Sequence, residues 1–446
     1  MQSYYFDCSD MLEYKVFWCK TNKYFTEKWM DHPFLEGKWG IFIASCVVTD
    51  KAKAKWVKFA RKRLEKLPKD AYLFLSGCWN LKNGMIDPHF FETYHELADY
   101  KEQIVLLPED PEDYVNNRTT WLQERIRKFQ VLSSKKQIFT RKYMVIQMGC
   151  DNFCTFCLTV QARWRHKWRP EKEILEEIQH FTENGWKEIV LTGTNLGAWW
   201  ADSSNDYHSS QFVSLIHTIL ASTTIERIRI SSLGVEFLND DCIKLFWKKR
   251  INAYVHLSIQ SGSSDILKWM NRHYDAIILQ DVLKKLRAVQ REDGISLNIW
   301  ADIIVGFPWE SEEDQKKSEA LIHKYWITQL HAFPFSAHED HYSIPAGKYE
   351  QQIPEHIKTR RLNSILSIGW KELNLFLQKH DGIRLRVLIE KTDEHTIFQW
   401  WSENYISCNE WNFTPDIWSH LCRWHIITGI YRYTGINAGN SFMEND

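Results

Sequence analysis

The chain has 446 residues, of which 44% are hydrophobic and 25% charged, and its formal net charge is −1. This length predicts roughly two to four domains, and the balanced charge excludes a protein whose whole surface attracts RNA. The first ten residues lack a basic segment followed by an apolar run. No apolar stretch approaches the roughly 18 residues of a membrane span. We therefore expect a cytoplasmic protein without a membrane segment.

The first 115 residues alternate short apolar runs with polar stretches that are long enough for helices. The runs 14–17, 40–44 and 72–75 are predicted strands, and residues 52–67 are a predicted helix. Strands that alternate with helices indicate βαβ units and a parallel sheet. Residues 1–115 should therefore form an α/β domain, followed by a polar linker at 116–135.

From residue 143 the alternation continues and the strands can be counted. Six apolar runs are predicted strands: 143–148, 188–192, 227–231, 254–259, 298–305 and 329–333. Helical patterns fill the intervals, including residues 170–184, where a proline begins the helix. Six βα repeats predict a partial (β/α)6 barrel over residues 136–375, with its chemistry at the carboxyl ends of the strands.

After residue 382 the pattern changes to short apolar runs separated by turn residues, at 385–389, 396–398 and 425–428. This pattern predicts a small antiparallel β-barrel over residues 378–434. That module holds six Lys or Arg against seven Asp or Glu, so it lacks the usual basic footprint of an RNA-binding domain.

Two basic runs offer a local surface for RNA phosphates. Residues 51–69 hold nine Lys or Arg against one Glu, and residues 163–172 form a second run. Contacts between such runs and phosphates give affinity that depends on salt and not on base sequence. A solvated helix face is an equally open interpretation of both runs.

Three cysteines directly follow the first predicted barrel strand: Cys150, Cys154 and Cys157. Spacings of four and three residues let three thiolates hold one side of a small iron–sulfur cluster. Four irons with three protein ligands leave one iron open, and that position suits the amino and carboxylate groups of S-adenosylmethionine. The alternatives are a zinc site, with His166 as the nearest fourth ligand, and three unconnected core thiols.

A second set of cysteines follows the three predicted strands of the first domain: Cys19, Cys46 and Cys78. The carboxyl ends of parallel strands share one edge of a sheet, so these thiols can converge there on a second cluster. Buried structural cysteines are the competing interpretation. The other four cysteines have no partner spacing and are interpreted as structural: Cys8, Cys242, Cys408 and Cys422.

A series of short motifs resembles the radical-SAM methylthiotransferases over nearly the whole chain. They lie at residues 19–22, 45–52, 76–78, 150–157, 191–197, 260–263, 270–272, 302–308, 331–336 and 402–406. The motifs C-K-T-N, V-T-D-K-A, L-T-G-T-N and R-I-S-S are most similar to the branch that acts on N6-threonylcarbamoyladenosine at tRNA position 37. The last motif, in the predicted C-terminal barrel, resembles the RNA-binding TRAM module.

The resemblance implies two 4Fe-4S clusters and S-adenosylmethionine as cofactors. Cys150, Cys154 and Cys157 would hold the cluster that reduces S-adenosylmethionine to a 5′-deoxyadenosyl radical, which takes hydrogen from carbon 2 of adenine. Cys19, Cys46 and Cys78 would hold the auxiliary cluster, whose open iron presents the sulfur that is methylated and transferred. Four residues at strand ends would lie near the cofactor, although a turn role is equally open for each: Gly193, Asn195, Ser261 and Gly306.

The resemblance also implies tRNA as substrate and an electron donor such as flavodoxin or ferredoxin. The alternatives are methylthiolation of another tRNA adenosine or of a ribosomal-protein aspartate. A non-catalytic relative that only binds a cluster or RNA is a further alternative.

Tryptophan is unusually frequent, with 22 residues against 18 glycines. Several tryptophans stand where the family pattern has glycine: Trp18, Trp164, Trp300, Trp309, Trp411 and Trp418. Glycine serves at turns because it tolerates positive φ and close backbone approach. We hypothesise that UGA codons specifying glycine were translated as tryptophan. The alternative is genuine tryptophan in a degenerating gene, and the cysteine predictions are the same in both cases.

Overall fold

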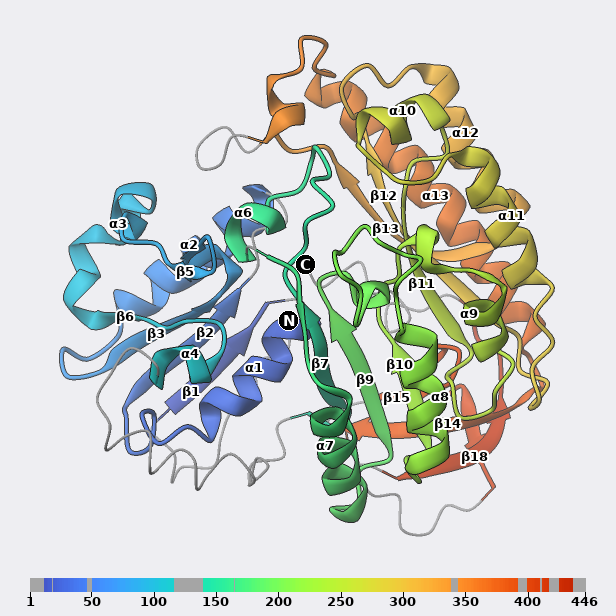
Figure 1. Ribbon diagram of the computed structural model, residues 1–446, viewed down its shortest axis with the longest axis horizontal. Coiled ribbons are helices and arrows are strands. Elements are labelled where there is room, and N and C mark those ends of the chain that lie inside the picture. Colours follow the sequence, from blue (N-terminus) through green and yellow to red (C-terminus); the bar gives the residue numbers. More distant parts are fainter. Residues whose placement is uncertain are drawn as a thin grey trace.

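The computed structural model describes residues 12–17, 19–45, 50–115, 139–163, 165–337, 344–391, 399–409, 411–416 and 425–435. Figure 1 shows the N-terminal domain in blue beside the central barrel, and the C-terminal sheet in red below the barrel. Several predicted features lie outside the described residues: the linker 116–135, the strand 396–398, Cys8, Cys46, Cys422, Trp18, Trp164 and Trp418.

The N-terminal domain is a parallel four-stranded sheet with crossover helices, as predicted. The strand order is β1 (Leu12–Val16), β2 (Gly40–Ser45), β3 (Tyr72–Gly77) and β6 (Ile104–Leu106). Helix α1 (Lys20–Met30) connects β1 to β2, and α2 (Asp50–Leu64) connects β2 to β3. The remaining elements are β4 (Leu81–Lys82), β5 (Met85–Ile86), α3 (Phe90–Thr93), α4 (Pro111–Val115) and the 3-10 helices η1 (Cys78–Asn80) and η2 (His95–Gln103).

Six parallel strands form the central partial barrel, each within two residues of its predicted bounds. They are β7 (Lys142–Met148), β9 (Glu188–Gly193), β10 (Arg227–Ile230), β11 (Tyr254–Gln260), β12 (Asn298–Val305) and β13 (Ile327–Pro334). The order β10-β9-β7 is extended at one edge by the antiparallel β8 (Lys167–Trp168), and β11-β12-β13 form a second sheet. Bridges Ile228–Ile251 and Leu233–Leu257 join the two sheets into one curved wall.

Helices cover the outside of this wall, as Figure 1 shows. They are α7 (Glu171–Glu183), α8 (Phe212–Ser222), α9 (Asp240–Leu245), α10 (Ser264–Trp269), α11 (Ala276–Arg287), α12 (Glu312–Lys324) and α13 (Glu355–Lys379). Helix α6 (Thr159–Arg163) instead packs against the N-terminal domain. Side chains alternate along each strand, so Ile299, Ala301 and Ile303 of β12 pack in the main hydrophobic core. The intervening Trp300 and Asp302 lie on the opposite face of the strand, which lines the barrel interior.

The C-terminal module is an antiparallel five-stranded sheet with the order β16 (Ser407–Cys408), β15 (Gln399–Ser402), β14 (Arg384–Lys391), β18 (Ile426–Tyr431) and β17 (Phe413–Pro415). Helix α13 continues through the expected domain boundary near residue 378. Its Phe376 and Leu377 pack in the core of the small sheet. This helix therefore links the barrel wall to the C-terminal module.

Three tryptophans adopt the left-handed backbone region that favours glycine: Trp200 (φ 62°), Trp309 (φ 64°) and Trp326 (φ 50°). A non-glycine residue held there costs about 1–3 kcal/mol. Trp309 therefore has the backbone that we expected, whereas Trp411 lies in a turn and has no positive φ. Trp300 is buried within β12 and points toward the rings of Tyr254 and His331 in the barrel interior.

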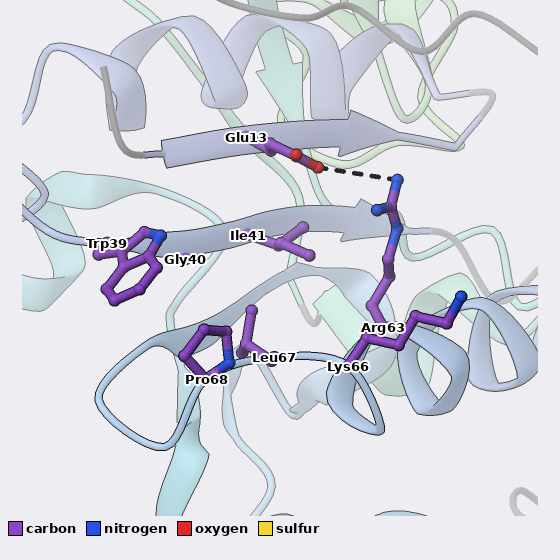
Figure 2. Close-up of a pocket in the computed structure, with 8 residues that line it drawn as sticks. All are labelled: Glu13, Trp39, Gly40, Ile41, Arg63, Lys66, Leu67 and Pro68. Atoms are coloured by element: carbon purple, nitrogen blue, oxygen red, sulfur yellow. Dashed lines mark ion pairs between the residues drawn. The ribbon is translucent and has the colours of Figure 1, made fainter. Parts of the chain in front are cut away.

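A pocket in the N-terminal domain lies at the amino-terminal ends of β1 and β2 (Figure 2). It is lined by apolar side chains such as Trp39 and Ile41 and by the ion pair between Glu13 and Arg63. The cysteines follow the opposite ends of these strands. The pocket in Figure 2 is therefore separate from the predicted chemistry.

Candidate active site

The loop after β7 carries Cys150, Cys154 and Cys157 at the carboxyl ends of the barrel strands, as expected. Within the loop, the Cys157 amide donates to the Cys154 carbonyl at 3.0 Å. The turn after α10 holds the loop from outside, because the Thr155 amide donates to the Met270 carbonyl at 3.1 Å. Helix, turn and strand thus fix the backbone from which the three thiols project.

Each of the three sulfur atoms accepts at least one hydrogen bond. The donors are Ser204 Oγ to Cys150 Sγ (3.5 Å), Arg272 Nη1 to Cys154 Sγ (3.3 Å) and the Thr159 amide to Cys157 Sγ (3.4 Å). Donors of this kind stabilise thiolates. Burial nevertheless raises the pKa of Cys150 to about 12, so this thiol ionises when a bound metal displaces its proton.

The spacing of these sulfurs indicates which metal centre fits. Among the described residues, one set of three metal-ligand atoms lies within 4.8 Å of one another, and it contains none of these cysteines. A single zinc ion would hold its sulfur ligands about 3.8 Å apart, because its bonds to sulfur are about 2.3 Å long. Three cysteine ligands from one loop, with no fourth protein ligand, suit an iron–sulfur cluster better than a structural zinc ion.

His166 cannot complete a zinc site, because both of its ring nitrogens are used. Gln147 Nε2 donates to Nδ1 at 2.8 Å, and Nε2 donates to the Ala201 carbonyl at 3.2 Å. Burial lowers the pKa of His166, which matches a neutral ring in this arrangement. The zinc alternative therefore lacks the fourth ligand that the sequence offered.

The second cysteine set lies at the carboxyl edge of the N-terminal sheet. Cys19 follows β1 and Cys78 follows β3, and these strands flank β2 in a parallel sheet. Both thiols lie beside the guanidinium of Arg163, whose Nη2 is 3.8 Å from Cys19 Sγ. Two of the three predicted ligands thus converge, and the third, Cys46, lies outside the described residues.

Arg163 connects the two cysteine sets. It ends α6, the helix that follows the Cys157 loop, and its side chain reaches across to the N-terminal domain. There it forms a two-point ion pair with Glu109, with Nε to Oε2 at 3.0 Å, and both side chains are buried. Arg163 is therefore not part of an exposed RNA surface, which corrects the interpretation of the 163–172 run at its first residue.

A polar triad lies inside the barrel on three adjacent strands. His256 Nε2 donates to Asp302 Oδ1 at 2.8 Å, and His331 Nδ1 donates to the same oxygen at 3.2 Å. Ser232 Oγ donates to Asp302 Oδ2 at 3.3 Å. Burial opposes ionisation of Asp302, but the two histidines outweigh it and hold the pKa of Asp302 well below its ordinary value. Burial lowers the pKa of His256, so the triad is a carboxylate with neutral His256.

Lys20 of the N-terminal domain interacts electrostatically with Asp302 of this triad. It is the first residue of α1, directly after Cys19, and it is half-buried. Burial lowers the pKa of its ammonium to about 8, and the neighbouring Arg229 lowers it further, whereas Asp302 raises it. The Lys20 ammonium makes no hydrogen bond or ion pair with any residue that the structure describes.

The lower end of the barrel is closed by a turn of the C-terminal module. Glu188 forms ion pairs with Arg227 (2.9 Å) and Arg229 (2.7 Å), and all three side chains are fully buried. The Arg229 guanidinium lies over the Tyr405 ring at 3.8 Å and donates to the Ser402 carbonyl at 3.3 Å. Burial opposes ionisation of Glu188, but the two arginines lower its pKa to about 2. Glu188 thus shares its one negative charge between two buried arginines.

Two of the predicted cofactor residues, Gly193 and Asn195, lie next to the Cys150 loop. Gln147 Oε1 accepts from the Asn195 amide at 2.7 Å, and Asn195 Nδ2 donates to the Ser204 carbonyl at 2.7 Å. A Cβ atom on Gly193 would lie 2.9 Å from the Gln147 carbonyl oxygen, closer than such contacts allow. Both residues therefore shape the wall beside the loop.

The other two predicted cofactor residues make turn contacts. Ser261 is fully buried, and its Oγ accepts from the Ser263 amide at 3.2 Å. Gly306 has a φ of 68°, and its amide donates to Glu310 Oε2 at 2.6 Å. These contacts support the structural interpretation, and cofactor contact by either residue stays a prediction.

Four residues at the site had no role in the sequence analysis: Ser204, Arg272, His256 and Glu109. Arg272 was part of a resemblance motif, at 270–272, so the motif pointed to it without giving its contact. Ser204 and Glu109 carry no local signal. Ser204 lies next to the Cys150 sulfur, and Glu109 next to the Arg163 guanidinium, only because the chain folds.

No helix among the described residues is both long enough and apolar enough to cross a bilayer. Comparison with known proteins agrees with the geometry of the site. Residues 144–322 match the family model of the radical SAM superfamily. The threonylcarbamoyladenosine tRNA methylthiotransferase MtaB of Bacillus subtilis (strain 168) is 30% identical over 66% of this chain and 64% of its own length.

Two further relatives cover different shares of the chain. The MtaB of Thermotoga maritima is 28% identical over 88% of this chain and 89% of its own length. The tRNA-2-methylthio-N(6)-dimethylallyladenosine synthase of Bdellovibrio bacteriovorus is 32% identical over 56% of this chain and 53% of its own length. Residues 144–322 thus form a radical SAM domain, with a three-cysteine loop at the mouth of a partial (β/α)6 barrel, and the chain as a whole is similar to tRNA methylthiotransferases.

Proposed function

We propose that this protein attaches a methylthio group to carbon 2 of N6-threonylcarbamoyladenosine at position 37 of tRNA, using two 4Fe-4S clusters and S-adenosylmethionine. The observation that carries the proposal is the meeting of the two cysteine sets around Arg163, which lies between Cys19 and the Cys157 loop. A reaction that needs both a radical source and a sulfur source requires such proximity. The relatives named MtaB support threonylcarbamoyladenosine as the substrate.

Cys150, Cys154 and Cys157 would hold the first cluster. When bound, this cluster supplies the electron that cleaves S-adenosylmethionine. The chain itself holds the thiolates in place through Ser204 and Arg272, and Arg272 is itself anchored to Glu236 at 3.6 Å. These contacts keep the ligands oriented before the cofactor arrives.

Cys19, Cys46 and Cys78 would hold the second cluster. The buried Arg163 places a positive charge beside these thiolates, and such a charge favours the ionised ligands. Its partner Glu109 fixes the guanidinium in this position. The same ion pair joins the N-terminal domain to the barrel between the two cysteine sets.

The test is nucleoside mass spectrometry of tRNA from a host that lacks the modification and expresses this chain. We expect new 2-methylthio-N6-threonylcarbamoyladenosine, and none from a Cys154→Ala variant. Purified enzyme with reduced flavodoxin or ferredoxin as electron donor should give the same product. A methylthio group on another adenosine, or on a ribosomal-protein aspartate, would overturn the proposed substrate. No methylthiolated product of any kind would overturn the reaction.

A further inference from the structure

Aromatic rings gather at the mouth of the barrel, on segments that follow three neighbouring strands. Trp269 ends α10, which follows β11, whereas Trp309 follows β12 and Tyr349 follows β13. Trp269 is 47% exposed, so its indole is not a core side chain. We propose that the rings of Trp269 and Tyr349 form a stacking site for one base of a single-stranded RNA loop. This inference rests on the proposed function and deepens it, because it names what holds the RNA beside the target base.

The rings of Trp269 and Tyr349 form a corner. Their centroids lie 6.0 Å apart, and their planes meet at 67°. The indole of Trp309 lies in this corner, with its centroid 4.4 Å from the Trp269 ring and 4.6 Å from the Tyr349 ring. It is tilted by 33° to the first ring and by 36° to the second, each about half of the corner angle. A flat aromatic ring therefore fits against both partners at once.

The backbone at residue 309 does not favour an indole. Its φ of 64° lies in the left-handed region, where every residue except glycine is strained. Trp309 is also one of the positions at which the resemblance predicts glycine. Glycine there would open the corner and leave Trp269 and Tyr349 in place. The indole therefore marks where a planar ring from another molecule would lie.

Hydrogen bonds connect the corner to the loop of the first cysteine set. The Trp269 carbonyl accepts from Thr155 Oγ1 at 2.9 Å and from the Tyr349 hydroxyl at 3.4 Å. The Ala346 amide donates to the Thr155 carbonyl at 3.0 Å. Because Thr155 directly follows Cys154, a base held in the corner lies beside the barrel mouth. An RNA strand whose target base enters the barrel brings a neighbouring base to this position.

Charge near the corner is balanced. The exposed Lys268 and Lys348 lie next to the two aromatic residues in the chain, and the exposed Asp265 and Glu350 lie on the same two segments. Phosphate contacts at this site therefore add little affinity. Stacking on the rings supplies most of it, and stacking tolerates any base because every base has a π-face.

A protein partner is the main competitor, because exposed Trp and Tyr side chains also anchor protein interfaces. Two features favour RNA. The corner accepts one flat ring, and it adjoins the loop beside which the reacting base enters. Trp247 provides the contrast: it is also 47% exposed, but it follows α9 and has no ring contact among the residues that the structure describes.

The test measures binding of an anticodon stem-loop RNA that carries 2-aminopurine at the loop position next to the target adenosine. Stacking on an aromatic ring quenches the fluorescence of 2-aminopurine. With the iron-loaded Trp309→Gly protein we expect quenching, and an affinity roughly 10-fold higher than with the chain that carries Trp309. Adding Trp269→Ala to Trp309→Gly should remove both effects, whereas adding Trp269→Phe should retain most of them. Adding Trp247→Ala is the matched control and should change neither.

Removing the neighbouring base gives an independent readout. An abasic site at this loop position should weaken binding to Trp309→Gly. It should make no difference once Trp269→Ala is added, because the ring that the base contacts is then absent. An equal loss of affinity in both proteins would overturn the inference.

Three other results would also overturn it, at equal iron content of the variants. They are unchanged quenching after Trp269→Ala, tighter binding by the chain with Trp309 than by Trp309→Gly, and slower reduction by flavodoxin with unchanged RNA binding. The last result would assign the surface to a protein partner. The proposed reaction is judged separately by nucleoside analysis. A protein that stacks the base but yields no methylthio product removes the reaction and leaves the stacking site.

Discussion

Both cysteine sets lie next to hydrogen-bond donors, but different parts of the fold position them. Cys150, Cys154 and Cys157 come from one loop of eight residues, and each sulfur has its own nearby donor. Cys19 and Cys78 come from separate strands and share one guanidinium, Arg163, which belongs to the barrel. The first set is a local motif, whereas the second set depends on the N-terminal sheet and on its contact with the barrel. Damage to the fold should therefore affect the second set first.

The largest expected effect comes from substituting a cysteine of the first set. Cys154→Ala removes one of three ligands, so the protein should lose its first cluster and form no 5′-deoxyadenosine from S-adenosylmethionine. Anaerobic assays with chromatography of the nucleoside product measure this loss. Cys242→Ala is the control, because Cys242 is fully buried in the hydrophobic core and contacts neither set. Normal S-adenosylmethionine cleavage by Cys154→Ala would contradict the ligand assignment.

Substituting a cysteine of the second set should separate S-adenosylmethionine cleavage from methylthio transfer. Cys78→Ala should retain S-adenosylmethionine cleavage but lose methylthio transfer, with roughly half of the bound iron remaining if each set holds one cluster. Iron analysis and tRNA nucleoside analysis on the same preparation measure both. Cys408→Ala, a buried thiol of the C-terminal sheet, provides the control. If Cys78→Ala keeps full transfer activity, the second cluster is not at this edge.

The contact between the domains can be weakened without touching a cysteine. Glu109→Gln leaves the buried Arg163 without its carboxylate, at a cost of about 3–5 kcal/mol for an uncompensated buried charge. Unfolding in denaturant should show this loss, together with reduced iron content of the second set. Glu112→Gln breaks only a surface pair with Lys28 and should change stability by less than about 1 kcal/mol. Equal effects of the two variants would contradict the role of the buried pair.

The smallest expected effect concerns the pH dependence of the stability of the N-terminal domain, on which the second cysteine set depends. Burial lowers the pKa of His32 to about 4, and its Nδ1 accepts from the Phe34 amide at 3.2 Å. Because the folded pKa is below the ordinary 6.5, this stabilisation is present above pH 6.5 and is lost as pH falls from 6.5 to 4. The loss is at most about 3 kcal/mol.

Denaturant unfolding across this pH range should show a weaker acid dependence for His32→Asn than for wild type. The exposed His89 is the control, and His89→Asn should follow the wild-type curve. Parallel curves for His32→Asn and wild type would show that His32 does not titrate in this range.

Sequence reasoning predicted the elements well because their signals are periodic. The strand 298–305 matches β12 in both bounds, and its alternation separates core-facing Ile299 from interior-facing Trp300. The convergence of Cys19 and Cys78 also followed from topology, because parallel strands end at one edge. These predictions needed only local patterns and one general rule about sheets.

The contacts between distant residues could not be predicted in the same way. Arg163 and Glu109 are 54 residues apart, and His256 and Asp302 are 46 apart. No local pattern relates such pairs, since each depends on how two separately formed units pack. The basic run at 163–172 illustrates the limit: charge alone predicted exposure for Arg163, but its partner lies on another domain.

The turn at residues 402–405 gives the C-terminal module a structural role in the barrel that does not depend on RNA. It accepts hydrogen bonds from Arg229 and Asn298, which lie near the amino-terminal ends of their strands. The module thus closes the end of the barrel that lies opposite the cysteines. Its nearly equal numbers of basic and acidic residues suit this structural role better than nucleic-acid binding. Under the proposed function, removing the module would let oxygen and water enter the barrel from below, so a shortened protein should lose its clusters even where it still binds tRNA.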